Sequence, residues 1–351
     1  MFNGFYADKR IFLTGDTGFK GAWIALWLSH MGAKVGTFSL APHTEPSLHG
    51  LTGVSSIVQR LGGDIRQSAP LAQAMLEFQP DIVIHMAAQS LVRPSYEAPL
   101  ETFDTNVMGT ANVLDAVRKS GSVRGVINVT SDKCYDNKEW IWGYRENDPM
   151  GGHDPYSASK GCAELVTSSY IKSFFSEGDT AVASVRAGNV IGGGDFAKNR
   201  LIPDMIRAFS AGKTVRIRSP HATRPWQHVL EPLHGYLMLA KKLFKEGHTF
   251  EGGWNFGPSD ESTRTVGEVV TTFSEKWGDS ARHELDQGTH PHEANLLKLD
   301  CSKAKQLLGW QPKSDFSLAL DWTTSWYKGW SEGRDCTEMT LGQIKKFEEL
   351  P

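Results

Sequence analysis

The chain has 351 residues, which is long enough for one large or two medium domains with a substantial core. Its formal net charge of -3 gives no electrostatic reason to expect binding to nucleic acid or to an anionic membrane. The 4 cysteines are scattered without a Cys-x-x-Cys pair, which argues against a metal site or a disulfide framework and suits a reducing compartment. The chain reaches an apolar strand by Ile11 without a signal-peptide core, and no apolar run approaches the roughly 20 residues that span a bilayer. We therefore expect a cytoplasmic globular protein.

A glycine-rich loop follows the first expected strand. The run Arg10–Thr14 is apolar enough for a buried strand, and an apolar helix (22–31) and a second strand (34–40) come after the loop. The spacing Gly-x-x-Gly-x-x-Gly allows a tight turn and a close approach of the backbone to a pyrophosphate at the helix N-terminus. Such a triplet also occurs in plain structural turns, but the strand–loop–helix–strand context favours a dinucleotide site. The predicted cofactor-binding residues of this loop are Gly15, Thr17, Gly18, Phe19, Lys20 and Gly21.

The second strand ends without the carboxylate that commonly binds the adenine ribose of NAD. Ser39 and Leu40 stand there instead. Lys20 in the glycine loop could accept a 2′-phosphate, so these residues alone leave both NAD and NADP open. Asp64 and Ile65, which follow a connecting segment, are expected near the adenine.

The next elements repeat the alternation of strands and helices. Residues 81–89 form an apolar run that ends in small residues, which is typical of a parallel strand buried on both faces. His85 within it is expected to be a core histidine, and Ala87 and Ala88 would let a cofactor lie close over the strand end. A helix is expected over 100–120 and further strands over 125–129 and 182–186. This rhythm predicts an α/β fold of the Rossmann type, a doubly wound parallel sheet with ligands at the carboxyl ends of its strands.

The stretch from Val129 to Lys160 carries the predicted chemistry. Ser131, Asp132 and Lys133 come directly after the buried strand 125–129. A helix then begins after residue 154, whose aspartate suits the N-cap, with proline at the first helical position. Tyr156 and Lys160 stand four residues apart and therefore share one face of that helix.

A tyrosine hydroxyl is a poor base at neutral pH because its usual pKa is about 10. We expect the Lys160 ammonium and the positive end of the helix dipole to lower the pKa of Tyr156 toward about 7, so that it can take a proton from a sugar hydroxyl. The alternative is that Tyr-x-x-x-Lys arises by chance on a solvated helix. Its place after an N-cap and a serine-bearing strand end favours catalysis.

Together these motifs resemble the extended short-chain dehydrogenase/reductases that act on nucleotide sugars. The resemblance rests on Thr14-Gly15-x-x-Gly18-Phe19-x-Gly21, Ala87-Ala88, Asn106, Ser131 and Tyr156-x-x-x-Lys160. It extends through the second half, where the blocks 186–192, 200–203, 224–229, 255–258 and 299–310 are similar to those of the substrate domain. The resemblance implies NAD as cofactor, and it adds Gln89, Asn106 and Thr130 to the cofactor-binding residues, along with Tyr156 and Lys160.

The residues after Ser131 separate the branches of this family. Sugar 4-epimerases carry small hydroxylated residues there and many 4,6-dehydratases carry an acidic pair, whereas this chain has Asp132 and Lys133. It resembles the branch that dehydrates CDP-glucose to CDP-4-dehydro-6-deoxyglucose, for deoxysugar biosynthesis and cell-surface polysaccharide. The resemblance implies that Tyr156 and Lys160 assist oxidation at C4, and that Asp132 protonates the departing 6-hydroxyl. Lys133, which must be neutral to act, is implied as the base at C5.

Three alternatives stay open at this point. The chain could be a 4-epimerase or simple dehydrogenase of the same fold, a dehydratase of another nucleotide hexose, or a dinucleotide sensor without catalysis. For Asp132 and Lys133, the alternative to a catalytic role is a solvated ion pair at the strand end. No nucleobase code is legible in the residues themselves.

The domain organisation is predicted from the same resemblance. Residues 1–188, with 222–257 returning to them, are expected to bind NAD; 189–221 and 258–351 are expected to bind the nucleotide sugar, and 279–293 is expected to be a polar loop. The family's helix pairing implies a homodimer or a dimer of dimers, for which the apolar Val166, Tyr170 and Ile171 are further support. The predicted substrate-binding residues are Gln89, Asn189, Arg200, Leu201, Ile202, Arg224, His228 and His292.

Overall fold

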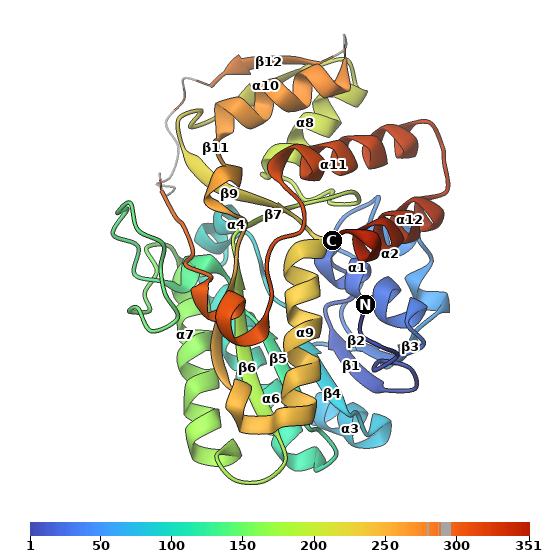
Figure 1. The fold of residues 1–351 in the computed structure, drawn as a ribbon, viewed down its shortest axis with the longest axis vertical. Coiled ribbons are helices and arrows are strands. Elements are labelled where there is room, and N and C mark those ends of the chain that lie inside the picture. Colours follow the sequence, from blue (N-terminus) through green and yellow to red (C-terminus); the bar gives the residue numbers. More distant parts are fainter. Residues whose placement is uncertain (279–280, 287, 289–295) are drawn as a thin grey trace.

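The computed structural model describes all residues except 279–280, 287 and 289–295. A large parallel sheet with helices on both faces forms the lower part in Figure 1, and smaller sheets with further helices lie above it. The expected fold class, a doubly wound parallel sheet, is confirmed.

The large sheet has seven strands in the order β10-β6-β5-β4-β1-β2-β3, and every neighbouring pair is parallel. The order reverses beside β1, so the carboxyl ends of β1 and β4 border the crevice where such sheets bind ligands. The strands are β1 (Arg10–Thr14), β2 (Lys34–Phe38), β3 (Gln59–Arg60), β4 (Ile82–His85), β5 (Gly125–Val129), β6 (Ala181–Ala187) and β10 (Gly252–Phe256).

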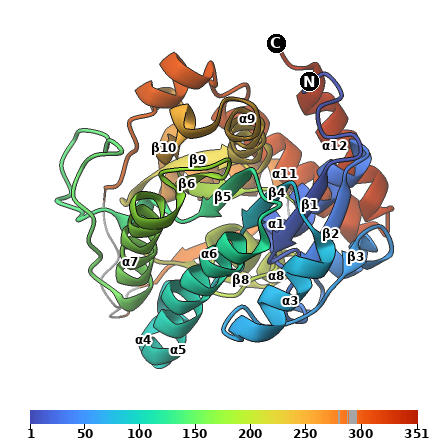
Figure 2. The same ribbon diagram turned by 90° about the horizontal axis from the view of Figure 1, so that it is seen from below.

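Two helix layers cover this sheet, as the view from below in Figure 2 shows. Consecutive strand residues point to opposite faces: Ile11 and Leu13 belong to one core cluster and Phe12 to another. One layer contains α1 (Phe19–His30) and α9 (Leu230–Glu246), and the other contains α3 (Ser68–Phe78), α6 (Gly109–Ser120) and α7 (Pro155–Tyr170). Trp23 and Trp27 of α1 are fully buried and pack in the core.

The second part is built from short strands and four longer helices. Its three-stranded sheet has the order β11-β9-β7, and β8 pairs with β12. The strands are β7 (Asn189–Ile191), β8 (Thr214–Ile217), β9 (Thr223–His228), β11 (Thr263–Thr265) and β12 (Arg282–Leu285), and the helices are α8 (Leu201–Ser210), α10 (Val266–Trp277), α11 (Phe316–Ser331) and α12 (Cys336–Glu349). Short helices elsewhere are α2 (Leu48–Leu51), α4 (Val92–Glu97) and α5 (Pro99–Phe103).

Two expectations about elements need correction. The helix expected over 100–120 is divided by a π-helical turn, Asp104–Met108, between α5 and α6. A second π-helical turn, Ile171–Phe175, follows α7. Within the segment expected to be a loop, Arg282–Leu285 forms β12. Its four side chains are exposed and three of them are polar, so the sequence resembles a loop, but its backbone pairs with β8. The rest of that expectation falls partly outside the described residues.

Helix α7 begins as its sequence predicts. The Asp154 carboxylate accepts a hydrogen bond from the Ser157 backbone N–H at 3.0 Å, and Pro155 occupies the first helical position. The Tyr156 N–H donates to the Ser95 hydroxyl at 3.1 Å, which ties this first turn to α4. The start of α7, and therefore the position of Tyr156 relative to α4, is fixed by these two hydrogen bonds.

Candidate active site

A cavity of about 790 Å³ opens at the carboxyl ends of the large sheet's strands and extends to α8 and β8 of the second part. It is lined by the glycine loop, by the ends of β4 and β5, by the first turn of α7, and by residues of β7, α8 and β9. Most of the predicted site residues meet here although they come from segments far apart in the chain.

The glycine loop has the close contacts that its spacing predicts. A Cβ on Gly15, whose φ is +83°, would lie 2.6 Å from the Ala87 backbone nitrogen, and a Cβ on Gly21 would lie 1.9 Å from the Gly15 carbonyl oxygen. Gly18 is the N-cap of α1 and makes no side-chain cap hydrogen bond. The first N–H groups of α1 therefore border the cavity, which suits an anionic group at a helix N-terminus.

Ser39, at the end of β2, holds this loop in place. Its hydroxyl accepts from the Gly15 N–H at 2.7 Å and donates to the Asp16 carboxylate at 2.5 Å. His49 lies 3.4 Å from the same carboxylate, which is buried. Asp64, which was expected near the adenine, forms an ion pair with Arg66, with an Nη2–Oδ2 distance of 2.6 Å. Both Asp64 and Ile65 line the cavity.

Lys20 lies at the catalytic end of the cavity and not at the end of β2. Its electrostatic neighbours are Arg200, Asp132 and Lys160, and burial lowers the pKa of Lys20 to about 8. The idea that Lys20 accepts a 2′-phosphate is therefore corrected, because its side chain lies among the predicted catalytic residues.

Ala87, Ala88 and Gln89 line the cavity at the end of β4, but Asn106 does not. Asn106 is buried. Its side-chain amide accepts a hydrogen bond from the Gln89 N–H and donates one to the Gln89 carbonyl, both at 2.9 Å. It also donates to Ser159 of α7 at 2.8 Å. In this structure Asn106 therefore supports the cavity wall from behind. His85 is confirmed as a core residue; its Nδ1 lies 2.7 Å from the Thr14 hydroxyl.

The end of β5 presents Ser131, Asp132 and Lys133 to the cavity. The Ser131 hydroxyl accepts from the Lys133 N–H at 3.2 Å and donates to the Asp132 carboxylate at 3.0 Å. Burial raises the pKa of Asp132, while the charges of Lys133 and Arg224 and the Ser131 hydrogen bond act in the opposite direction. A carboxyl group with a raised pKa is well suited to donate a proton.

Tyr156 and Lys160 face the same space from α7. Burial raises the pKa of Tyr156 to about 12, although a hydrogen bond with Ser131 lowers it. Burial also lowers the pKa of Lys160 to about 8, and its Nζ donates to the Val129 carbonyl at 3.3 Å. The expected fall of the Tyr156 pKa toward 7 is therefore wrong for this protein without its ligands, because desolvation outweighs the nearby positive charges.

Glu164, one further turn along α7, anchors the helix to the sheet. Its carboxylate accepts from Thr130 at 2.5 Å, from Ser184 at 2.6 Å, and from Arg186 at 2.7 and 2.8 Å. Burial alone would raise the pKa of Glu164, but Arg186 and the hydroxyl donors hold it below its ordinary value. Arg186 also donates to the Tyr135 hydroxyl at 2.6 Å. The two halves of the predicted catalytic stretch are thus joined through one buried carboxylate.

On the opposite side, Asn189, Arg200, Leu201, Ile202 and Arg224 line the cavity. Arg200 donates to Asp195 at 2.9 Å and to the Ser90 hydroxyl at 3.1 Å, so it bridges the two parts of the fold.

One predicted substrate ligand lies outside the cavity, and another falls outside the described residues. His228 lies in the core with its ring edge-on to Trp23 and Trp322, and burial lowers its pKa to about 3. His228 is fully buried and does not line the cavity, which corrects its prediction as a ligand. His292 lies outside the described residues.

Sequence reasoning missed three residues of the site. Glu164 had a usable signal, because it continues the four-residue spacing of Tyr156 and Lys160. Asp195 follows three glycines and is fixed by Arg200, but nothing in its own segment indicates that partner. Arg218 lines the cavity beyond β8, in a segment without a recognisable motif.

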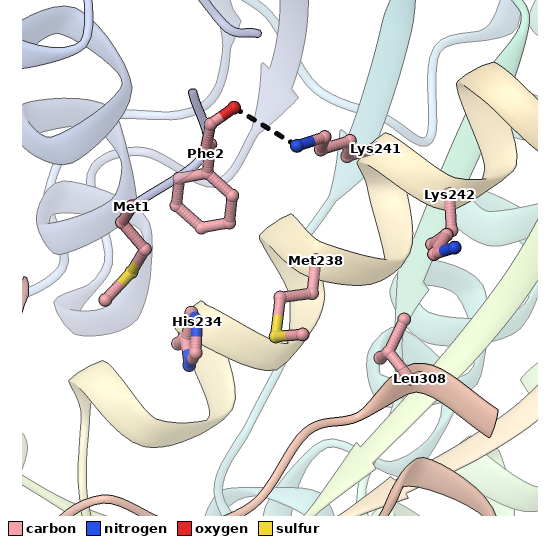
Figure 3. Close-up of a pocket in the computed structure, with 7 residues that line it drawn as sticks. All are labelled: Met1, Phe2, His234, Met238, Lys241, Lys242 and Leu308. Carbon is pink, nitrogen blue, oxygen red and sulfur yellow. Dashed lines mark hydrogen bonds between the residues drawn. The ribbon is translucent and has the colours of Figure 1, made fainter. Parts of the chain in front are cut away.

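A second cavity, of about 230 Å³, lies between the N-terminus and α9 (Figure 3). It is lined by His234 and Met238, and Lys241 donates to the Phe2 carbonyl at 3.1 Å beside it. None of the predicted site residues lies there. Within the described residues, no group of three or more His, Cys, Asp or Glu side chains is placed to hold a metal ion. Of the helices described, none is both long and apolar enough to cross a membrane.

The fold and the site together define a dinucleotide-binding enzyme class in which Ser, Tyr and Lys converge at a strand end. The family model described as GDP-mannose 4,6 dehydratase matches residues 12–321. The CDP-glucose 4,6-dehydratase of Salmonella typhimurium is 53% identical over 348 residues, which cover 98% of this chain and 97% of that relative. The chain therefore belongs to the GDP-mannose 4,6 dehydratase family, and the expected membership in the nucleotide-sugar dehydratase branch is confirmed.

More distant relatives and solved structures agree on the fold. The dTDP-glucose 4,6-dehydratase of Streptomyces antibioticus is 28% identical over 268 residues, covering 76% of this chain and 75% of that protein. The crystal structure of dTDP-glucose 4,6-dehydratase from Streptomyces venezuelae with NAD and TYD bound superposes with a TM-score of 0.78 at 24% identity, covering 93% of this chain and 99% of that one. UDP-glucose-4-epimerase from Stenotrophomonas maltophila, with bound NAD, gives 0.81 at 20% identity and the same coverage.

Proposed function

We propose that the protein converts CDP-glucose to CDP-4-dehydro-6-deoxyglucose and water, with NAD as a cofactor that ends the cycle unchanged. The observation that carries this proposal is the convergence of Tyr156, Lys160, Ser131, Asp132 and Lys133 in one cavity. The 53% identity to a CDP-glucose 4,6-dehydratase over almost the whole of both chains supports the choice of substrate.

The residues of the glycine loop fit a dinucleotide. Gly15 and Gly21 leave no room for a Cβ, and the start of α1 borders the cavity. Gly18 to Gly21 would hold the pyrophosphate, Asp64 and Ile65 the adenine end, and Tyr156 with Lys160 the nicotinamide end. When bound, the oxidised nicotinamide supplies the hydride acceptor, a positive charge beside Tyr156, and later the hydride that reduces C6. We propose NAD over NADP, because Lys20 lies away from the ribose end.

Tyr156 takes the proton of the sugar 4-hydroxyl. A hydrogen bond with Ser131 and the positive charge of Arg200 both lower the pKa of Tyr156 and so favour its phenolate. Lys160, one turn along α7, is the further cation that favours proton loss from the tyrosine. Ser131 hydrogen-bonds the oxygen at C4, which becomes a ketone.

Asp132 and Lys133 carry out the elimination. The 4-ketone acidifies the hydrogen at C5, and neutral Lys133 removes that proton. Asp132, whose pKa burial raises, donates its proton to the departing 6-hydroxyl, which leaves as water. The C5 proton on Lys133 returns to C5 once C6 has been reduced. The proton that Tyr156 took from the 4-hydroxyl passes to solvent, and Asp132 regains one from solvent, so the protons balance over the cycle.

The second part of the fold is proposed to grip the nucleotide. Arg224 has the guanidinium fork that matches phosphate oxygens, Asn189 lines the same cavity, and Leu201 and Ile202 give an apolar surface for the base. This assigns 189–221 and 258–351 to nucleotide-sugar binding and 1–188 with 222–257 to NAD.

We further propose a homodimer or a dimer of dimers through α5, α6 and α7. Val166, Tyr170 and Ile171, which were expected to support this contact, pack partly against the core. The stronger support is Leu165, which is 62% exposed on α7, together with Leu100, which is 84% exposed on α5. Sedimentation at several concentrations should show a dimer or tetramer mass, and a constant monomer mass would contradict the proposal.

A panel of nucleotide sugars tests the function. The protein should be incubated with NAD and, separately, with CDP-, dTDP-, GDP- and UDP-glucose, and a 4-keto product followed by its absorbance in alkali. We expect product from CDP-glucose above the others. Conversion to a galactose epimer without water loss would instead make the protein a 4-epimerase.

A further inference from the structure

We propose that Arg218 selects the cytosine base of the substrate by donating two hydrogen bonds to N3 and O2 of the ring. This inference rests on the proposed function, since it names how the same cavity distinguishes CDP-glucose from other pyrimidine nucleotides. It starts from the one cavity-lining arginine whose hydrogen-bonding capacity the described residues leave unused.

Arg218 follows directly after β8 and lines the cavity. Its guanidinium makes no hydrogen bond or ion pair with any described residue, and its buried Nη1 has no partner. By contrast, Arg200 and Arg207 on the same side are both paired with aspartates. A buried donor without a partner is unfavourable unless a ligand supplies the acceptor, so this arginine is placed for a group that enters from the cavity.

The surroundings of Arg218 suit a flat ring. Ile217 precedes it on β8, and Leu201 and Ile202 of α8 line the same cavity, which gives apolar surface next to a cation. The charge of Arg218 acts to lower the pKa of Asp204 on α8, so the two side chains are near each other. They form no ion pair, because Asp204 pairs with Arg207. The guanidinium therefore stays available while its charge is partly balanced.

The order of groups along the cavity matches the order of groups in the substrate. Arg224 acts electrostatically on Asp132 at the catalytic end, whereas Arg218 acts on Asp204, which belongs to the second part. A nucleotide sugar with its hexose at Asp132 would place its diphosphate beside Arg224. The nucleoside then extends beyond the diphosphate, toward α8 and β8.

A guanidinium carries only donors, and that decides which base it favours. Cytosine presents two adjacent acceptors, N3 and O2, which match two N–H groups of one guanidinium. Uracil and thymine carry a hydrogen on N3, so the same approach would set donor against donor. A bidentate contact of this kind typically discriminates between bases by about 5- to 150-fold.

The test compares the binding of CDP and UDP, without turnover, to the full-length protein by calorimetry. Wild type should bind CDP at least about tenfold more tightly than UDP. Arg218→Gln, which has both a donor and an acceptor, should lose most of this preference. Arg334→Gln makes the same charge change at an exposed ion pair with Glu332 and should leave the CDP-to-UDP ratio unchanged.

Two results would overturn the inference. Equal weakening of CDP and UDP in Arg218→Gln would make Arg218 a general electrostatic contact, and an unchanged affinity for both would remove it from the nucleotide site. If Arg218→Gln is unstable, Arg218→Lys decides in the same assay, because a lysine keeps the charge but loses the paired donors. The proposed function is tested independently by the panel of nucleotide sugars. Turnover of dTDP-glucose and not CDP-glucose by wild type would reject the proposed function, whatever the binding result for Arg218→Gln.

Discussion

The two walls of the large cavity are built in different ways. The proposed catalytic wall carries Ser131, Asp132, Lys133, Tyr156 and Lys160. Behind it, the Glu164 carboxylate accepts four hydrogen bonds and joins α7 to β6 and to Thr130, the residue after β5. The proposed nucleotide wall carries Asn189, Leu201, Ile202, Arg218 and Arg224. Arg218 makes no hydrogen bond or ion pair with the described residues. Among these residues, the strand before it, β8, pairs only with β12, whose four side chains are exposed.

This difference separates the two tasks of the site. Chemistry at C4, C5 and C6 needs groups held within a fraction of an ångström, so the protein fixes them before the substrate binds. Recognition of the nucleotide can use donors that the ligand itself completes. Substitutions on the first wall should therefore affect rate and stability, and substitutions on the second should affect affinity.

The largest effect should come from Tyr156→Phe. Removal of the hydroxyl takes away the acid–base group at C4, so turnover of CDP-glucose should fall by about 10⁴-fold. Binding of CDP by calorimetry should stay within about twofold, because the tyrosine lies on the catalytic wall. A comparable loss of CDP affinity would show that the two walls are not separate, and residual turnover above a few per cent would remove Tyr156 from its role.

Glu164→Gln should be the next most severe change, and it acts on stability. The substitution leaves the Arg186 charge buried without its partner, which should lower the free energy of unfolding by about 3–5 kcal/mol. Chemical denaturation measures this. Glu246→Gln is a matched control, because its exposed pair with Lys242 on α9 should contribute less than about 1 kcal/mol.

Replacement of Glu164 and Arg186 together by methionine tests the reason for this loss. The double variant removes both charges, so much of the stability should return while turnover stays low, because Thr130 and Ser184 lose their shared acceptor. A double variant with normal turnover would show that the buried pair does not position the catalytic wall.

Lys133→Met should stop the reaction after the first step. We expect the 4,6-dehydratase rate to fall by about 10²–10³-fold, because the base at C5 is lost while Tyr156 is untouched. The measurement is exchange of the C5 hydrogen with deuterated water, followed by mass spectrometry of the recovered sugar. Exchange at close to the wild-type rate in Lys133→Met would assign the proton removal to water or to another residue.

The smallest effect concerns pH. Lys160 has a pKa of about 8 in the folded chain and about 10.5 when unfolded, so between these values the unfolded chain binds more protons and stability rises with pH. From pH 7 to pH 9.5 this amounts to roughly 2 kcal/mol. Lys160→Met should lack that part of the rise, as the difference between the two denaturation curves will show. If stability rises equally with pH in wild type and in Lys160→Met, Lys160 is not a buried lysine with a lowered pKa.

Local patterns predicted much of this fold and part of the site. β1 and β5 have the predicted bounds, and the capped start of α7 follows from Asp154 and Pro155. These features depend on residues close together in the sequence. The direction of the Tyr156 pKa could not be predicted, because desolvation depends on how segments far apart close over the hydroxyl.

The misses on the nucleotide side have the same physical origin. His228 stands in a motif that resembles substrate-binding blocks, yet it is buried at the end of β9 against Trp23 of α1 and Trp322 of α11, which are far away in the sequence. Arg218 has no motif at all, and its place in the cavity arises from the packing of β8 against α8. Asn106 was expected to contact the cofactor, but a π-helical turn sets it behind Gln89.

The spacing of Tyr156, Lys160 and Glu164 along α7 also limits how this chain can change in length. Each added residue turns a helix by about 100°, so one insertion between Tyr156 and Glu164 would carry the carboxylate away from Arg186 and disconnect the helix from the sheet. The tip of the preceding loop, where Ile141 and Trp142 are exposed, has no such constraint. Descendants of this sequence should therefore differ by insertions and deletions at that tip, and within the helix only by substitutions.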